Sequence, residues 1–167
     1  GMYLNLKGRE ARGVVAPGAE SGALKAELIR KLTALKDGAN GPAAVTNVYD
    51  RDAVYSGPYK ENAPDLIIGY NEGYRASWDG VTGIVNAVVI DDNTKAWSGD
   101  HCIDPALVPG VLFSNLKIKT ANPSIMDIAP TALELFGLTP PAHMDGRGLV
   151  AVAGLSLRVN RYQSNNE

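Results

Sequence analysis

The densest group of chemically active side chains in this sequence lies in one short stretch, residues 96–105. It combines one imidazole, the only thiol and two carboxylates with turn-forming glycine and proline, and the side chains are His101, Cys102, Asp100 and Asp104. The stretch leads into an apolar run, residues 109–113, so we expect these side chains at the rim of a sheet, where binding and catalytic groups concentrate. A neutral imidazole beside oxygen ligands is one half of a zinc or other divalent metal site.

Ordinary turn chemistry accounts for the same residues. Aspartate and serine beside glycine and proline form turns, and a single histidine in a loop usually bonds to a nearby carbonyl. Metal sites bring three or four ligands together, whereas the chain has only 2 histidines, His101 and His143. A complete site would therefore need carboxylates or another polypeptide. Cys102 has no partner for an internal disulfide and is either buried or a spectator.

Length and charge limit the classes of function. The length of 167 residues predicts a single domain. We expect it to be an α/β domain over 2–155, followed by a polar tail over 156–167. A formal charge of −2 supplies no basic face for nucleic acid or anionic lipid. No apolar run approaches the roughly 20 residues that span a bilayer, and no basic segment followed by an apolar one marks a signal peptide. We therefore expect a soluble protein whose compartment stays undetermined.

A helix that packs on a sheet is predicted over residues 20–37. Leu24, Leu28 and Leu32 recur there at helical spacing, and most charged residues fall on the other face. The pattern predicts that these leucines face the core, and Gly38 is well placed to cap the carboxyl end.

Four extended or turn segments are expected around that helix. Residues 3–6 and 44–49 have the composition of strands, and residues 51–55 could form one helical turn. Residues 66–70 read Leu-Ile-Ile-Gly-Tyr, which is apolar on both faces and typical of an interior strand. In an open α/β sheet ligands collect at the carboxyl ends of strands. Asn71 and Arg75, just past this strand, are therefore candidate substrate-binding residues, with a solvated loop as the alternative.

The later part of the chain predicts irregular structure over 80–90 and another interior strand over 110–114. A helix follows, and its start depends on Pro130, because proline is tolerated in the first helical turn but costs about 3 kcal/mol in the interior. Asp127 as the N-cap puts Pro130 at the third helical position, whereas Ser124 would place it deeper. We therefore favour Asp127, with the helix ended by Gly137 and these side chains facing the core: Ile128, Leu133 and Phe136.

Three segments in the second half of the chain, in this order, resemble the C-terminal third of alkaline-phosphatase-superfamily hydrolases: SGDHCIDPALVPGVLFSN, PSIMDIAPTALELFG and MDGRGL. The closest branch is the type I phosphodiesterases and nucleotide pyrophosphatases. NLKGRE and APDLIIGY are similar to segments that precede these in bacterial members, so the resemblance extends to about Leu149. The ordered set is fairly specific to the superfamily, although each piece alone is weak.

This resemblance implies a partial alkaline-phosphatase-like sheet flanked by helices. Family members carry two divalent metals, usually zinc, that position a phosphoester for attack by serine or threonine, and two metals about 4 Å apart can activate the nucleophile and stabilise the leaving oxygen. A late histidine ligand comes from a Gly-x-His motif, and His101 is the only position that matches it. Asp100 would then orient that imidazole, as carboxylates beside metal-binding histidines often do.

The sequence also departs from the family. No segment matches the first metal-binding aspartate or the nucleophile, and none of Ser98, Ser114 and Thr131 lies in the nucleophile's context, so no catalytic residue is assigned. The first hypothesis is a polypeptide that contributes His101 but turns over a phosphoester only when a missing part is supplied, because the gene is truncated or a partner chain provides it. The alternative is a noncatalytic interaction or homo-oligomerisation module with an exposed apolar surface.

Overall fold

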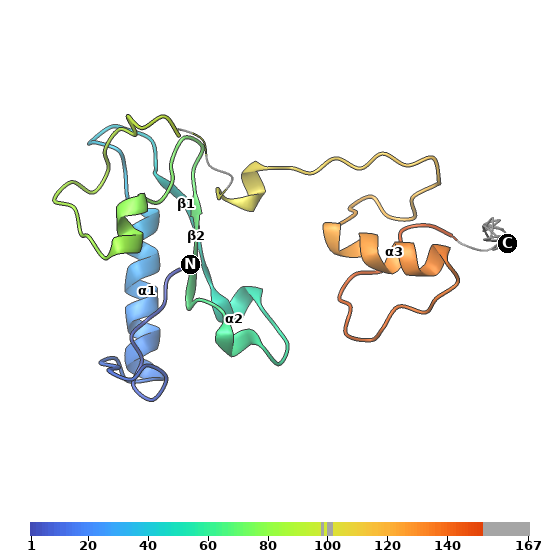
Figure 1. Cartoon of the computed structure of the whole chain (residues 1–167), viewed down its shortest axis with the longest axis horizontal. Coiled ribbons are helices and arrows are strands. Elements are labelled where there is room, and N and C mark those ends of the chain that lie inside the picture. Colours follow the sequence, from blue (N-terminus) through green and yellow to red (C-terminus); the bar gives the residue numbers. More distant parts are fainter. Residues whose placement is uncertain (98, 100–101, 152–167) are drawn as a thin grey trace, which may run out of the picture. The chain divides into compact units, whose positions relative to one another are not determined.

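The computed structural model describes residues 1–97, 99 and 102–151 of a mixed α/β chain (Figure 1). The predicted α/β class is therefore confirmed at this coarse level. The chain divides into two compact units, Gly1–Pro109 and Gly110–Glu167. The predicted domain over 2–155 spans both units, and the predicted tail over 156–167 lies outside the described residues. No described helix has the length and apolar character needed to cross a bilayer.

Unit 1 is built on a two-stranded antiparallel sheet of β1 (Val45–Asp50) and β2 (Leu66–Tyr70). The bounds of β2 agree with the prediction. Asn47 pairs with Gly69, and an irregularity in the register lies between Val45 and Asn47. Leu66, at the start of β2, is completely buried, which fits its place in an apolar strand covered on one face by a helix.

The N-terminal segment pairs with the sheet at one point only. Met2 forms an antiparallel bridge with Leu66, but the predicted strand over 3–6 is absent as a ladder, and the segment makes isolated bridges instead. A regular ladder does not form because the amide of Leu4 donates to the side-chain carboxylate of Asp65, at 2.7 Å, and not to a backbone carbonyl of β2. That bond ends the pairing with β2 after one residue.

Helix α1 (Ala19–Thr33) lies beside the sheet (Figure 1) and packs against β1. Its predicted inner face is correct, although Leu24, Leu28 and Leu32 are only half-buried. The prediction that the helix reaches residue 37 and is capped by Gly38 is wrong. The chain reverses earlier, because the Ala44 amide donates to the Leu35 carbonyl at 3.0 Å and pulls the end of the helix into a turn.

Short helical segments connect these elements. The predicted turn over 51–55 is observed as α2 (Arg51–Val54), which begins where the Asp50 carboxylate accepts the amide of Asp52 at 2.9 Å. Residues 80–90 are irregular apart from the end of a single 3-10 turn, Trp78–Thr82, as expected.

Unit 2 contains helix α3 (Ile128–Leu135), preceded by a 3-10 turn, Ile125–Asp127. The helix has Asp127 at the N-cap position, so Pro130 stands third in the helix as predicted. Ser124 contributes as well, because its hydroxyl accepts the Met126 amide at 3.3 Å and its own amide donates to the Asp127 carboxylate at 2.9 Å. A capping box therefore starts the 3-10 turn, and α3 continues from it.

The predicted interior strand over 110–114 is wrong. This segment is irregular, with Val111 84% exposed and Phe113 91% exposed. A strand needs a neighbouring strand to bond its backbone, and no described residue pairs with this segment. Ile128 and Phe136, which we expected to face the core, are also exposed because no described layer covers that side of α3.

Candidate functional site

The carboxyl end of β2 is the part of unit 1 where the predicted substrate-binding residues lie. The Asn71 side chain is bonded to the protein's own backbone, donating to the Ala43 carbonyl at 2.8 Å and accepting the Glu72 amide at 2.9 Å. These bonds hold the turn that follows β2. Asn71 therefore shapes the edge of the site, and its amide already has a donor and an acceptor partner.

Arg75 reaches from this turn to the His101 loop. Its guanidinium donates to the Gly99 carbonyl at 3.4 Å. The same group lies over the Trp78 ring, 5.6 Å from the ring centre, within the range of a cation–π interaction. Arg75 thus connects the turn after β2 to Gly99.

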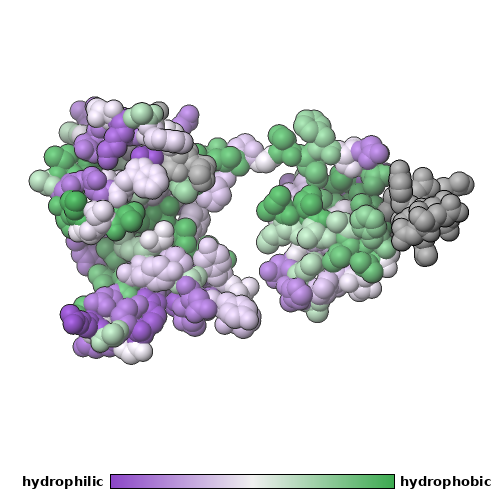
Figure 2. All heavy atoms as spheres, in the orientation of Figure 1, coloured by the Kyte–Doolittle hydropathy of each residue, from purple (hydrophilic) through white to green (hydrophobic). Residues whose placement is uncertain are grey.

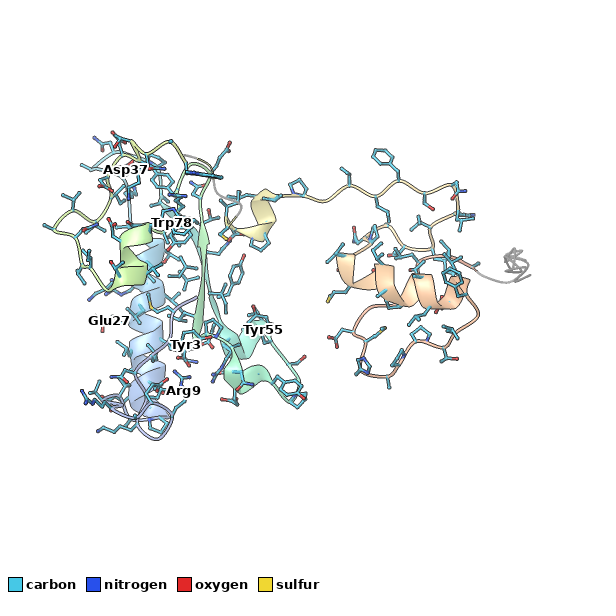
Figure 3. The ribbon with its side chains drawn as sticks, in the orientation of Figure 1. Tyr3, Arg9, Glu27, Asp37, Tyr55 and Trp78 are labelled. Atoms are coloured by element: carbon cyan, nitrogen blue, oxygen red, sulfur yellow. The ribbon has the colours of Figure 1, made fainter. Side chains whose placement is uncertain are left out.

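A cavity of about 580 Å³ opens beside Arg75 and is lined by residues from three stretches of unit 1, within 35–45, 70–79 and 89–95. Figure 3 shows Asp37 and Trp78 at the same end of the unit, away from Arg9. The Tyr74 hydroxyl donates to Asp37 at 2.9 Å, and burial together with this bond raises the pKa of Tyr74. The charged lining residues are mostly acidic: Asp37, Glu72, Arg75, Asp79, Asp91, Asp92 and Lys95.

Asp104 is the most deeply buried polar residue at this site, with no exposed surface. Its backbone amide donates to the carbonyl of Tyr70, the last residue of β2, at 2.9 Å. Its carboxylate accepts from the Asn47 amide at 2.8 Å and from the Tyr49 hydroxyl at 3.0 Å. The Ala106 amide completes the set at 2.9 Å.

Burial opposes ionisation of the Asp104 carboxyl, but the hydrogen bonds from Asn47, Ala106 and Tyr49 outweigh it, so the pKa of Asp104 is lowered. Burial, followed by the bond to Asp104, raises the pKa of Tyr49. The charge therefore resides on the aspartate. The sequence placed Asp104 among the reactive residues of this loop, but it contained no signal for the partners on β1, which are more than 50 positions away.

His101 and Asp100, the predicted metal ligand and its orienting carboxylate, lie outside the described residues. The described neighbours of this pair are Gly99, bonded to Arg75, and Cys102, which is exposed, so the alternative of a buried cysteine is wrong. His143 is exposed in a loop of unit 2. Within residues 1–97, 99 and 102–151, no three His, Cys, Asp or Glu side chains converge on a point that could hold a metal ion.

In unit 2 the segment over residues 123–137 bonds to the segment over residues 144–149. The Asp127 carboxylate accepts the Arg147 amide at 2.9 Å. The Thr131 hydroxyl donates to the Asp127 carbonyl at 2.5 Å and accepts the Leu149 amide at 2.9 Å. Thr131 therefore joins α3 to the segment around Leu149 in this unit.

An apolar groove of about 560 Å³ runs along the same unit. We call it the unit 2 groove, and the residues that line it are Leu112, Phe113, Ser114, Asn115, Leu116, Ile118, Ile128, Thr131, Leu135, Leu149 and Val150. Figure 2 shows hydrophobic residues gathered over much of this unit's visible face. The groove joins the unpaired segment over 110–114 to one side of α3.

Comparison of the chain with protein-family models, with curated proteins and with solved structures finds no match. The similarity to the alkaline-phosphatase superfamily rests on the motifs of the sequence alone.

Proposed function

We propose that this chain contributes part of the metal centre of a phosphodiester hydrolase of the alkaline-phosphatase superfamily. His101 is the metal ligand, Asp100 orients its imidazole, and zinc is the expected ion. The sheet of unit 1 is then a portion of an alkaline-phosphatase-like sheet. The described residues alone do not assemble a metal site. The proposal assigns the nucleophile and the remaining ligands to another polypeptide segment, because no part of this sequence matches the family's segments that carry them, and it predicts that the chain alone is inactive.

One observation carries this proposal: the described residues on both sides of His101 are attached at the carboxyl end of β2. On the one side, Gly99 accepts a bond from Arg75, which follows that strand. On the other side, the amide of Asp104 is bonded to Tyr70. The β1–β2 sheet is antiparallel, so the rule that ligands collect at the carboxyl ends of parallel strands is not the support. The support is that both described flanks of His101 are attached at the same end of β2.

Arg75 is the residue we assign to the phosphoester. A guanidinium suits an anionic phosphate because its planar donors match two oxygens at once. Arg75 is one of the two basic residues in the mostly acidic lining of this cavity, and Asn71, the other predicted substrate residue, is bonded to backbone groups. We assign Asn71 to holding the turn that presents Arg75.

Zinc binding to the isolated chain tests the role of His101 directly. In a proton NMR titration with zinc, we expect the ring signals of His101 to shift or broaden while those of His143, the matched control, stay in place. The His101→Ala variant should lose the response and His143→Ala should keep it. A zinc response confined to His143 would reject the metal-ligand assignment.

Turnover tests the other half of the proposal. The chain with added zinc should not hydrolyse bis(p-nitrophenyl) phosphate above the rate of zinc in buffer. Robust hydrolysis that is abolished by His101→Ala would show that the active site is complete within this chain.

A second function is favoured by the unit 2 groove. Of the residues that line it, Phe113 is 91% exposed and Leu112 and Ile128 are more than two-fifths exposed, and exposed apolar patches of this kind mark interaction sites. In this alternative the chain is a noncatalytic module that associates with a second copy of itself through the groove. Sedimentation velocity over a range of concentrations tests it, and a monomer at every concentration would reject it.

A further inference from the structure

We infer that Asp104 is a positioning residue, whose carboxylate is held in a socket on the sheet and thereby fixes the described loop around it, from Cys102 to Leu107, which follows His101 in the sequence. The socket is formed by Asn47 and Tyr49 of β1 and by Gly69 of β2. The link from this loop to a metal rests on the proposed function. The holding of the loop does not, because it follows from the contacts of Asp104.

The socket occupies one face of the β1–β2 sheet. Asn47 and Tyr49 are two residues apart on β1, so their side chains point to the same face, and both bond to the same carboxylate. Asn47 is the partner of Gly69 across the ladder. The three residues therefore form adjacent positions on a single surface, and Asp104 lies against it.

Gly69 supplies space for the carboxylate. A Cβ atom added to Gly69 would overlap the Asp104 side chain, starting with Oδ2. Gly69 is absent from the glycines with left-handed backbone conformation, so its conformation does not require glycine. Close approach is the remaining reason for glycine inside a strand, where it otherwise weakens the sheet.

A simpler role for Asp104 is the capping of the turn that follows it. The Asp104 carboxylate does accept the amide of Ala106 in the 3-10 turn Pro105–Leu107. A cap of this kind forms equally well in water, and it needs neither complete burial nor bonds to a strand. Removing a carboxylate from water is costly unless other groups replace the lost hydration, and Asn47 and Tyr49 do so. Those two bonds tie the loop to the sheet in a way that capping does not require.

The sole cysteine makes the loop directly observable. Cys102 lies between His101 and Asp104 and is exposed, so a nitroxide label attached there reports on the loop through its electron paramagnetic resonance spectrum. We expect a slow component in the unsubstituted chain. Asp104→Asn should reduce that component because only one acceptor oxygen then remains for the donors Asn47, Tyr49 and Ala106, and Tyr49→Phe should reduce it by removing one donor.

An exchange of the two partners provides the decisive variant. In Asn47→Asp combined with Asp104→Asn, an amide on the loop donates to a carboxylate on the strand, so the bond is restored in the opposite direction. The slow component should return in this double variant. A merely structural defect would not be repaired by moving the charge. Asp127→Asn, which removes another buried carboxylate but in unit 2, is the matched control and should leave the label's spectrum unchanged.

Three results separate this inference from the proposed function. An unchanged spectrum in both Asp104→Asn and Tyr49→Phe would overturn the inference, provided that the NMR signals of the buried Leu66 show that unit 1 is folded. A reduced slow component without recovery in the double variant would overturn it too. If the spectra behave as expected while the zinc response is confined to His143, the inference about Asp104 holds and the metal-ligand proposal fails. Should Asp104→Asn unfold unit 1, the milder Tyr49→Phe decides the matter alone.

Discussion

The carboxylate of Asp127 accepts the backbone amide of Arg147, 20 positions later in the chain, at 2.9 Å. The other oxygen accepts the amide of Ser124 at 2.9 Å, so a single buried side chain joins the start of α3 to the Asp-Gly-Arg loop. Charged acceptors make stronger hydrogen bonds than neutral ones. This junction is therefore the point at which unit 2 depends on a specific pair of sequence motifs.

The first prediction concerns the glycines of that loop. A Cβ atom on Gly146 would overlap the backbone of Met126 and Asp127, whereas one on Gly148 would meet only the Glu134 carboxylate. Backbone cannot move as cheaply as the end of a side chain, so Gly146→Ala should destabilise unit 2 by about 1–3 kcal/mol and Gly148→Ala by about 0.5 kcal/mol or less. Denaturant unfolding followed by signals of α3 measures both. Equal effects would show that the close approach at Gly146 is unimportant.

The second prediction concerns pH. Hydrogen bonds from the amides of Arg147 and Ser124 lower the pKa of Asp127 below its usual value. The ionised form therefore stabilises the folded state fully above the unfolded-state pKa of about 4, and this contribution disappears as the pH falls through the lower folded-state pKa. The melting temperature of unit 2 should fall as the pH is lowered from about 5 to about 3, a range that extends about one pH unit on each side of the unfolded-state pKa.

Asp127→Asn is the variant that tests this assignment. It should lower the melting temperature at neutral pH and flatten the decline in acid. An acid profile identical to that of the unsubstituted chain, measured on signals of unit 2, would assign the pH dependence to other carboxylates.

The third prediction concerns the ion pair at the N-terminal end of unit 1. Arg9 donates to both oxygens of Asp65, at 2.9 and 2.6 Å, and Asp65 is only 3% exposed. Burial opposes ionisation of Asp65, but the bonds from Arg9 and the Leu4 amide outweigh it and lower its pKa. Arg9→Ala leaves this buried charge poorly compensated and should destabilise unit 1 by about 1–3 kcal/mol.

Arg12 supplies the control for that experiment. It lies in the same N-terminal segment and is exposed, so Arg12→Ala should change the free energy of unfolding by about 0.5 kcal/mol or less. Both variants remove one positive charge, which keeps the change in net charge equal. A similar loss from the two would mean that net charge, and not the pair with Asp65, sets the stability.

The fourth prediction separates the two proposed functions. Phe113 is 91% exposed at the unit 2 groove, so Phe113→Ser should change the stability by about 0.5 kcal/mol or less. If the groove joins two copies, the same variant should reduce self-association in sedimentation velocity. Tyr59→Ser removes an aromatic residue that is 79% exposed outside the groove and should leave association unchanged. Association that survives Phe113→Ser would reject the groove as the interface.

The sequence by itself determined the features that depend on neighbours along the chain. The inner face of α1 follows from leucines at helical spacing, and β2 follows from an apolar run between turn residues. The place of Pro130 near the start of α3 follows from covalent geometry, because proline lacks an amide hydrogen and fits only the first helical turn. Each of these rests on interactions within a few residues, which the order of amino acids specifies directly.

Tertiary structure alone decided the partners of buried charges and the fate of the apolar run over 110–114. The sequence predicts Asp104 in a loop of reactive residues and Asp127 as a helix N-cap, but their bonds to Tyr49 and Arg147 exist only because the fold brings distant segments together. The run over 110–114 has the composition of a strand, yet strand formation depends on a neighbour that supplies hydrogen bonds, and composition cannot provide one. The metal-ligand role of His101 remains a prediction for the same reason, since a coordination site is a property of several residues converging in space.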